Sequence, residues 1–125
     1  RDITVVTYGL MLHYTLEAAE RLAKDGISVE VVDPRTIVPL DQKTILDSVK
    51  KTSKLLIVHE DNEFLGVGAE IAAIVADKGF SYLDAPIKRL CGPQVPAMPY
   101  NGPQQEWFMP NVEKIEKAIR DLVDF

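Results

Sequence analysis

The sequence has a single cysteine, no long apolar run and no excess of basic residues. Because Cys91 is the one cysteine among 125 residues, an internal disulfide and a metal site built from several cysteines are excluded. No apolar run approaches the roughly 18–20 residues that a transmembrane helix needs. Lys and Arg number 14 against 19 Asp and Glu, and this acidic balance argues against a protein that binds nucleic acid.

The composition is that of one soluble globular domain. A length of 125 residues fits a single domain over 1–125, and contents of 46% hydrophobic and 26% charged residues exclude intrinsic disorder. The first residue is Arg1 instead of Met, and a predicted strand follows at once. We therefore expect no signal peptide and a fragment cut at a domain boundary.

Short apolar runs alternate along the chain with segments of helical spacing. The runs predict strands at 3–8, 29–32, 55–58 and 86–91. The spacing predicts helices at 12–24, at 41–51 with Asp41 as the N-cap, at 67–78 and at 112–123. The acidic segment 59–63 and the proline-rich segment 92–103 are predicted to be connections. This alternation predicts an α/β fold, an open and mostly parallel sheet with helices on both faces.

The tract GVGAE at residues 66–70 lies between a predicted strand and a predicted helix. Glycines in that position can bring backbone N–H groups to a phosphate at a helix N-terminus. However, Ile71 occupies the place of the third glycine of a dinucleotide fingerprint, and the acidic segment before the tract would repel phosphate. We therefore favour a structural role, in which the glycines permit a tight turn and close helix packing.

His59 and Glu60 fall at the predicted carboxyl end of the third strand, the edge at which open α/β sheets bind ligands. His59 could act as a general acid or base, or it could bind a metal with Glu60 and His13, although no metal-ligand spacing is present. We favour a capped strand end that faces a partner. Cys91 ends another predicted strand, and an inert thiol is favoured over a nucleophile.

Three further features have two interpretations each. Arg35 could clamp an anion or pair with a carboxylate. The apolar cluster WFM at 107–109 could form an interface or pack locally in the core. The C-terminus concentrates negative charge on Asp121, Asp124 and the carboxylate of Phe125. That charge could dock a basic partner, or it could belong to a solvated tail.

Four strings taken together resemble one family. They are VDPRTIVPLD at 32–41, LIVHE at 56–60, GVGAEI at 66–71 and YLDAP at 82–86. In order and spacing they resemble the C-terminal domain of the transketolase superfamily. They look most like the beta subunit of the thiamine-diphosphate-dependent decarboxylase component of 2-oxo acid dehydrogenase complexes, of the pyruvate, branched-chain 2-oxo acid or acetoin type.

The resemblance implies that the chain is the last third of a beta subunit. The parent enzyme would oxidatively decarboxylate a 2-oxo acid and acylate a lipoyl group, in a bacterial cytoplasm or a mitochondrial matrix. In that family thiamine diphosphate and Mg²⁺ lie between the alpha subunit and the N-terminal domain of the beta subunit, together with the catalytic histidines. We therefore expect the chain to be inactive alone, and we assign it no catalytic, cofactor-binding or metal-binding residue.

The resemblance also implies partners. The family's domain packs in a heterotetramer against an alpha subunit and a second beta subunit. Its last helix lies near the docking place of the basic subunit-binding domain of a dihydrolipoyl acyltransferase. No nucleic acid and no membrane is expected as a partner. The expected partner contacts are Asp124 and Phe125 with Asp121, and, as weaker candidates, Val67, Gly68, Glu70 and Ile71.

Two alternatives remain open at this point. One is the C-terminal domain of another transketolase-type enzyme, either transketolase or a deoxyxylulose-phosphate synthase. The other is a free-standing nucleotide-binding α/β module that uses His59, Glu60 and the glycine tract.

Overall fold

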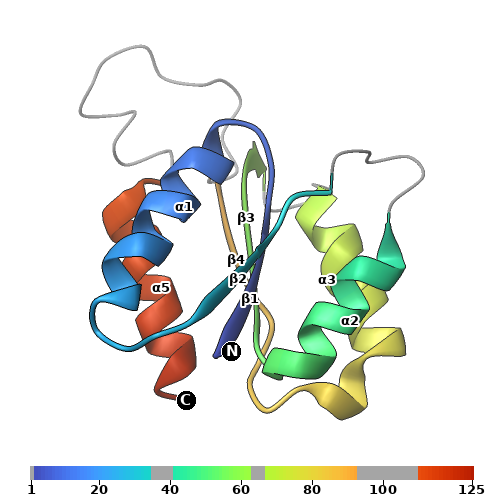
Figure 1. The fold of residues 1–125 in the computed structure, drawn as a ribbon. Coiled ribbons are helices and arrows are strands. Elements are labelled where there is room, and N and C mark those ends of the chain that lie inside the picture. The colour runs from blue at the N-terminus through green and yellow to red at the C-terminus, as the bar shows by residue number, and fades with distance from the viewer. Residues whose placement is uncertain (1, 35–40, 63–66, 93–109) are drawn as a thin grey trace.

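The fold is a parallel β-sheet between two layers of helices (Figure 1). The computed structural model of the chain describes residues 2–34, 41–62, 67–92 and 110–125. The elements are β1 (Ile3–Thr7), α1 (Leu10–Ala23), β2 (Val29–Val32), α2 (Gln42–Thr52), β3 (Leu55–Asn62), α3 (Val67–Lys78), the 3-10 turn η1 (Phe80–Tyr82), β4 (Lys88–Gly92) and α5 (Val112–Val123). The strands lie in the order β2-β1-β3-β4, and all neighbouring pairs are parallel. The predicted architecture is confirmed.

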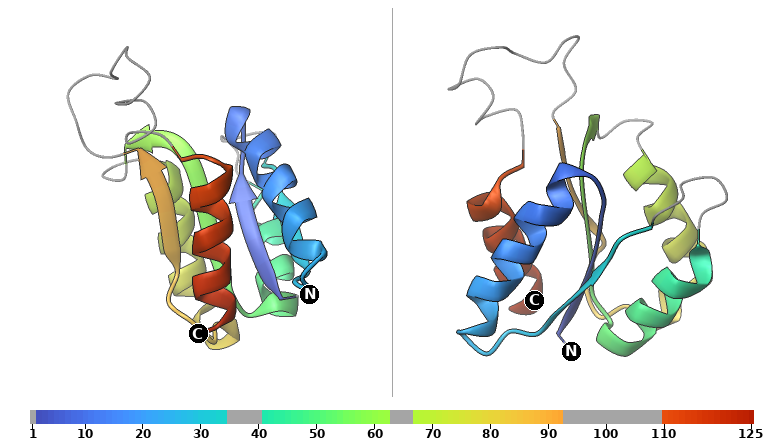
Figure 2. Two further views of the ribbon diagram at one scale, coloured as in Figure 1. Left: turned by 90° about the vertical axis from the view of Figure 1, so that its left-hand side faces the viewer. Right: turned by 45° about the horizontal axis from the view of Figure 1, so that its top comes forward.

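Two hydrophobic cores lie on the two faces of the sheet. Helices α1 and α5 cover one face, and α2 and α3 cover the other (Figures 1 and 2). Since successive strand residues point to opposite faces, β1 contributes to both cores. Ile3 and Val5 pack in the first core with Ile115 of α5, while Val6 packs in the second with Ile71 of α3. Burial on both faces explains why the central strands are continuous apolar runs in the sequence.

The parallel strands divide the molecule into two ends. The carboxyl ends of β1, β3 and β4 meet at the upper edge in Figure 1, and both marked chain ends lie at the lower edge. Helix α3 therefore begins at the carboxyl edge, and α5 ends at the amino edge of the sheet. Among the described residues, no helix combines the length and the apolar character that crossing a bilayer requires.

Local polar signals fix several helix ends. Asp41 accepts the Thr44 N–H at 3.1 Å and the Thr44 hydroxyl at 2.6 Å, so the predicted N-cap of α2 is confirmed. The side-chain hydrogen bond from Thr44, and then the backbone one, lower the pKa of Asp41. Asn111 caps α5 by accepting the Lys114 N–H at 2.9 Å. After α1, Gly26 takes the left-handed conformation (φ 81°) that glycine adopts readily at the end of a helix.

Several predicted boundaries are wrong. Residues 59–62, predicted to be an acidic connection, belong to β3, because β4 pairs with this extension and Asn62 lies opposite Gly92. Strand β4 begins at Lys88 instead of Pro86, α1 begins at Leu10 instead of residue 12, and the turn η1 was not predicted. These limits depend on hydrogen bonds to distant segments, which local sequence does not specify.

Some predictions lie outside the described residues. These are the environment of Arg35, the first glycine of the tract at position 66, nearly all of the connection 92–103, and the apolar cluster 107–109.

Candidate functional site

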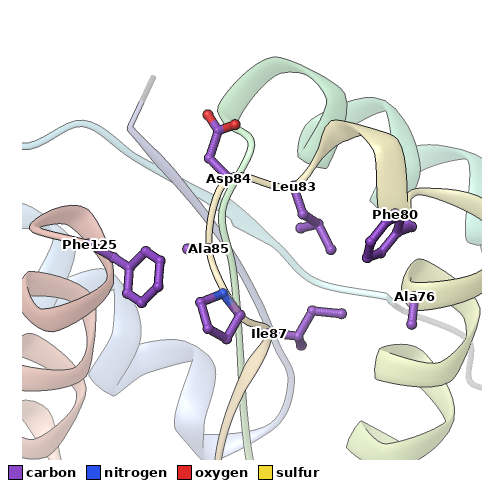
Figure 3. Close-up of a pocket in the computed structure, with 8 residues that line it drawn as sticks. Ala76, Phe80, Leu83, Asp84, Ala85, Ile87 and Phe125 are labelled. Carbon is purple, nitrogen blue, oxygen red and sulfur yellow. The ribbon is translucent and has the colours of Figure 1, made fainter.

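An apolar pocket lies at the amino edge of the sheet, beside Phe125. Its volume is about 460 Å³. Figure 3 shows Phe125 on one side of the segment that leads into β4, and Ala76 and Phe80 on the other side. The carboxylate of Asp84 turns away from the apolar side chains at the rim (Figure 3). The full lining is Ala76, Phe80, Leu83, Asp84, Ala85, Pro86, Ile87 and Phe125.

Two phenylalanines of the pocket are strongly exposed. Phe80 is 74% exposed to solvent and Phe125 is 71% exposed. Isolated exposed apolar residues are ordinary, but an exposed apolar patch with a polar rim is typical of an interaction site. Aromatic residues are also enriched in protein–protein interfaces. The pocket therefore has the character of a docking surface for an apolar group.

Hydrogen bonds to backbone carbonyl oxygens connect the segments around the pocket. Lys54, before β3, donates from Nζ to the carbonyl oxygen of Val123 near the end of α5, at 2.8 Å. The N–H of Asp84 donates to the carbonyl oxygen of Ser53 at 2.8 Å. Ser53 itself takes a left-handed conformation (φ 66°) at the end of α2. Three segments far apart in the sequence are thus tied together where the pocket forms.

Two acidic side chains, Asp121 and Asp124, are exposed at the end of α5. Asp121 already pairs with Lys117, Nζ to Oδ2, at 2.8 Å. Asp124 and Phe125 follow and are exposed. The first set of expected partner contacts therefore lies together, and their binding to a partner stays a prediction. Phe80, which the sequence analysis did not single out, lines the same pocket as Phe125. One feature of the sequence could have pointed to Phe80: this aromatic residue directly follows Gly79, the glycine at which the predicted helix 67–78 ends.

The second set of expected contacts lies at the opposite edge of the sheet, at the start of α3. Gly68 and Ile71 are buried within the chain, whereas Glu70 is exposed and Val67 is half-buried. The structure does not bring this set together with the acidic end of α5. A single partner of small size would therefore contact one set or the other.

His59, at this carboxyl edge, is fully buried and caps α3. Its Nε2 accepts the N–H of Gly68 at 3.0 Å. A β-carbon at position 68 would lie 2.3 Å from that nitrogen, so the close approach requires glycine. The favoured structural role of the tract is confirmed at Gly68. His59 is not a strand end as predicted, because β3 continues to Asn62, and its position facing a partner stays a prediction.

The alternative ligand sites receive little support. His13 is exposed on α1, and among the described residues no group of three or more His, Cys, Asp or Glu side chains could hold a metal ion. The metal site considered for His13, His59 and Glu60 is therefore wrong. A phosphate at the start of α3 would have to displace His59 from Gly68, which weakens the nucleotide-binding hypothesis.

Comparison with known proteins identifies the family of the chain. Residues 1–115 match the family model described as Transketolase, C-terminal domain. The chain belongs to this family, and the resemblance noted in the sequence is confirmed.

Its relatives include beta subunits of several dehydrogenases. The chain is 52% identical over 124 residues to the 2-oxoisovalerate dehydrogenase subunit beta of Bacillus subtilis, covering 99% of this chain and 38% of that protein. It is 48% identical over 120 residues to a mitochondrial pyruvate dehydrogenase E1 component subunit beta-1 of Arabidopsis thaliana, covering 96% and 33%. It is 40% identical over 122 residues to an acetoin:2,6-dichlorophenolindophenol oxidoreductase subunit beta of Bacillus subtilis, covering 98% and 35%.

A solved structure shares the fold. A split-gene transketolase, described as an inactive beta4 tetramer, superposes with a TM-score of 0.84 at 22% identity over 98% of this chain and 39% of that one. The chain spans about a third of the length of the curated relatives named above.

Proposed function

We propose that the chain is the C-terminal assembly domain of the beta subunit of a thiamine-diphosphate-dependent 2-oxo acid dehydrogenase. The observation that carries this proposal is the identity of 40–52% with three named beta subunits, over at least 96% of the chain. The parent enzyme would oxidatively decarboxylate a 2-oxo acid and acylate a lipoyl group. The bacterial and mitochondrial relatives support a cytoplasmic or matrix location.

The described residues do not themselves fit thiamine diphosphate and Mg²⁺. The N–H of Gly68 at the start of α3 already donates to His59. Within the described ranges, no cluster of carboxylates and histidines is arranged to bind a metal. The cofactor would therefore be bound by parts of the parent enzyme outside this chain, and the role of this chain would be to hold subunits together.

We infer that the end of α5 and the apolar pocket receive the basic subunit-binding domain of a dihydrolipoyl acyltransferase. The pocket offers an apolar surface formed by Phe80 and Phe125. Asp84, in the lining, and Asp124, next to Phe125, place negative charge beside this surface. Apolar anchoring with a complementary charged rim is the usual composition of a specific interface.

Titration calorimetry of the assembled enzyme with the subunit-binding domain tests this docking site. We expect Asp124→Lys and Phe125→Ala each to weaken binding by about tenfold or more at low salt, since anchors of this kind dominate interface energies. Asp47→Lys makes the same change of charge on the exposed side of α2, outside both proposed contact surfaces, and should leave the affinity unchanged. Full affinity of both α5 variants would refute the docking site.

We further propose that the exposed start of α3, with Val67 and Glu70, faces the alpha subunit or the second beta subunit. Because this surface lies at the opposite edge of the sheet from the end of α5, a substitution in one surface should not change binding at the other. Sedimentation of the assembled enzyme tests the assignment with Glu70→Lys and Asp124→Lys. Glu70→Lys should shift the heterotetramer towards smaller species, whereas Asp124→Lys should not. Intact heterotetramer with Glu70→Lys would contradict it.

A further inference from the structure

Ser53 and Lys54, the two residues between α2 and β3, contact both segments that form the apolar pocket. The carbonyl oxygen of Ser53 accepts the N–H of Asp84, a residue of the pocket lining, at 2.8 Å. Nζ of Lys54 donates at 2.8 Å to the carbonyl oxygen of Val123, two residues before Phe125. Asp84 and Phe125 come from separate segments (Figure 3). One short turn is therefore bonded to both of them.

The backbone of this turn is itself held in place. Ser53 takes a left-handed conformation (φ 66°), and its N–H donates to the carbonyl oxygen of Val49 of α2 at 2.7 Å. The carbonyl oxygen of Lys54 accepts the N–H of Thr4 of β1 at 2.9 Å and the hydroxyl of Thr52 at 3.1 Å. Thr4 and Thr52 are buried. The side chain of Lys54 therefore extends from a backbone position that the sheet and α2 fix.

Burial holds the body of α5, but not its end. Leu122 is buried in the first core, whereas Asp124 and Phe125 are exposed. The N–H of Phe125 donates to the carbonyl oxygen of Leu122 at 3.2 Å, so Phe125 continues the last turn and moves with it. The last carbonyl groups of a helix lack partners within the helix, and a lysine that binds one of them stabilises that end. Lys54 supplies this bond to Val123.

We propose that Lys54 is a positioning residue for docking, because its ammonium group fixes the end of α5 and with it the place of Phe125 in the pocket lining. This inference rests on the proposed function, since it names the group that orients the docking surface. Lys54 acts through Phe125 and needs no contact of its own with the partner. Without the bond to Val123 the partner has to order the end of α5 when it binds, and that ordering lowers the affinity.

The expected effect has the opposite sign to that of simple electrostatics. The proposed partner is basic, so the positive charge of Lys54 repels it, and removal of that charge alone would raise the affinity. If Lys54 acts by positioning, its removal lowers the affinity instead. Lys51, in the last turn of α2, offers a matched control, because it is exposed and its Nζ pairs with Glu30 of β2 at 2.8 Å, not with α5.

Titration calorimetry of the assembled enzyme with the basic subunit-binding domain measures this sign. Lys54→Met keeps the apolar stem of the side chain but removes the donor, and it should weaken binding about fivefold or more at low salt. Lys54→Arg keeps a charged donor and should retain most of the affinity, and Lys51→Met should not weaken binding. Unchanged or tighter binding by Lys54→Met, while Phe125→Ala still weakens it, would overturn the positioning role and leave the docking site standing.

A second substitution at Phe125 separates positioning from a general loss of stability. If Lys54 acts through Phe125, Lys54→Met should cost little further affinity in a Phe125→Ala background, since the aromatic ring that it orients is gone. Equal losses of affinity in the two backgrounds would contradict this coupling.

Hydrogen–deuterium exchange of the assembled enzyme without the partner tests the positioning by itself. The N–H groups of Asp124 and Phe125 donate to carbonyl oxygens of α5 at 3.0 and 3.2 Å, so a peptide covering residues 120–125 reports on this end. Lys54→Met should speed exchange in this peptide about threefold or more and leave residues 112–119 unchanged. Equal exchange at 120–125 would overturn the proposal whatever the affinities are. If sedimentation shows that Lys54→Met does not assemble, Lys54→Gln, with a shorter and uncharged side chain, replaces it in each measurement.

Discussion

At the scale of single residues, Gly68 shows how a local sequence feature depends on a distant partner. The residue occupies the second position of α3, where glycine has no conformational advantage. Its necessity comes from His59, whose Nε2 would lie 2.3 Å from an added β-carbon, and from Ile57, whose Cγ2 would lie at 3.1 Å. The sequence analysis could predict close packing by the glycine tract, but not which side chain approaches it.

Gly68→Ala should therefore destabilise the chain, although alanine is the better helix former. The clash and the lost hydrogen bond should outweigh the gain in helix propensity and lower the free energy of unfolding by about 1–2 kcal/mol. Urea unfolding followed by circular dichroism measures the difference. The same substitution made in a His59→Ala background should cost much less, because the imidazole is gone. An equal cost in both backgrounds would mean that His59 is not the source.

The pairing of His59 with Cys91 has the same character. Both residues were noted in the sequence, and both were placed at the ends of predicted strands. Their contact depends on β3 and β4 being neighbours with Val58 opposite Leu90, so that the next residues on the two strands face each other, and this strand order does not follow from local pattern. A contact of this kind is visible only when the strand order is known.

At the scale of elements, apolar spacing predicts the regular segments well. The limits of β2, α3 and α5 agree with the predicted ranges. The contacts of α2 with the sheet could not be predicted from the sequence. The hydroxyl oxygen of Thr4 lies 2.7 Å from the hydroxyl oxygens of both Ser48 and Thr52. The Ser48 hydroxyl also donates to the carboxylate of Glu30 at 2.8 Å. These polar residues fill buried positions that a search for apolar faces passes over.

The N-cap of α2 makes stability depend on pH. Hydrogen bonds from Thr44 lower the pKa of Asp41 below its ordinary value of 3.8. A lowered folded-state pKa stabilises the fold above the unfolded value, and this contribution is lost as the pH falls through the folded value. Asp41→Asn keeps a capping oxygen but does not titrate.

The advantage in unfolding free energy of wild type over Asp41→Asn should accordingly shrink between about pH 5 and pH 2. Urea unfolding at several pH values measures this advantage. Asp47→Asn, on the exposed side of the same helix, serves as a control for general loss of charge, and it should not reproduce the effect. An advantage that stays constant with pH would contradict the linkage.

At the scale of the whole molecule, the sheet separates two surfaces of different chemistry. The amino edge carries the apolar pocket and the acidic end of α5, and the carboxyl edge carries His59, Cys91 and the start of α3. The fold class follows from the alternation of strands and helices. The pocket does not, because it is assembled from the ends of α3, α5 and the segment before β4, and its aromatic member Phe80 has no periodic pattern to identify it.

Hydrogen–deuterium exchange on the assembled enzyme, with and without the subunit-binding domain of its acyltransferase, tests the assembly role most directly. The account predicts slower exchange on binding at residues 80–87 and 119–125, around the pocket and the end of α5. It predicts unchanged exchange at 67–71. Protection confined to 67–71, or no protection anywhere in residues 1–125 while the domain is bound, would contradict the account.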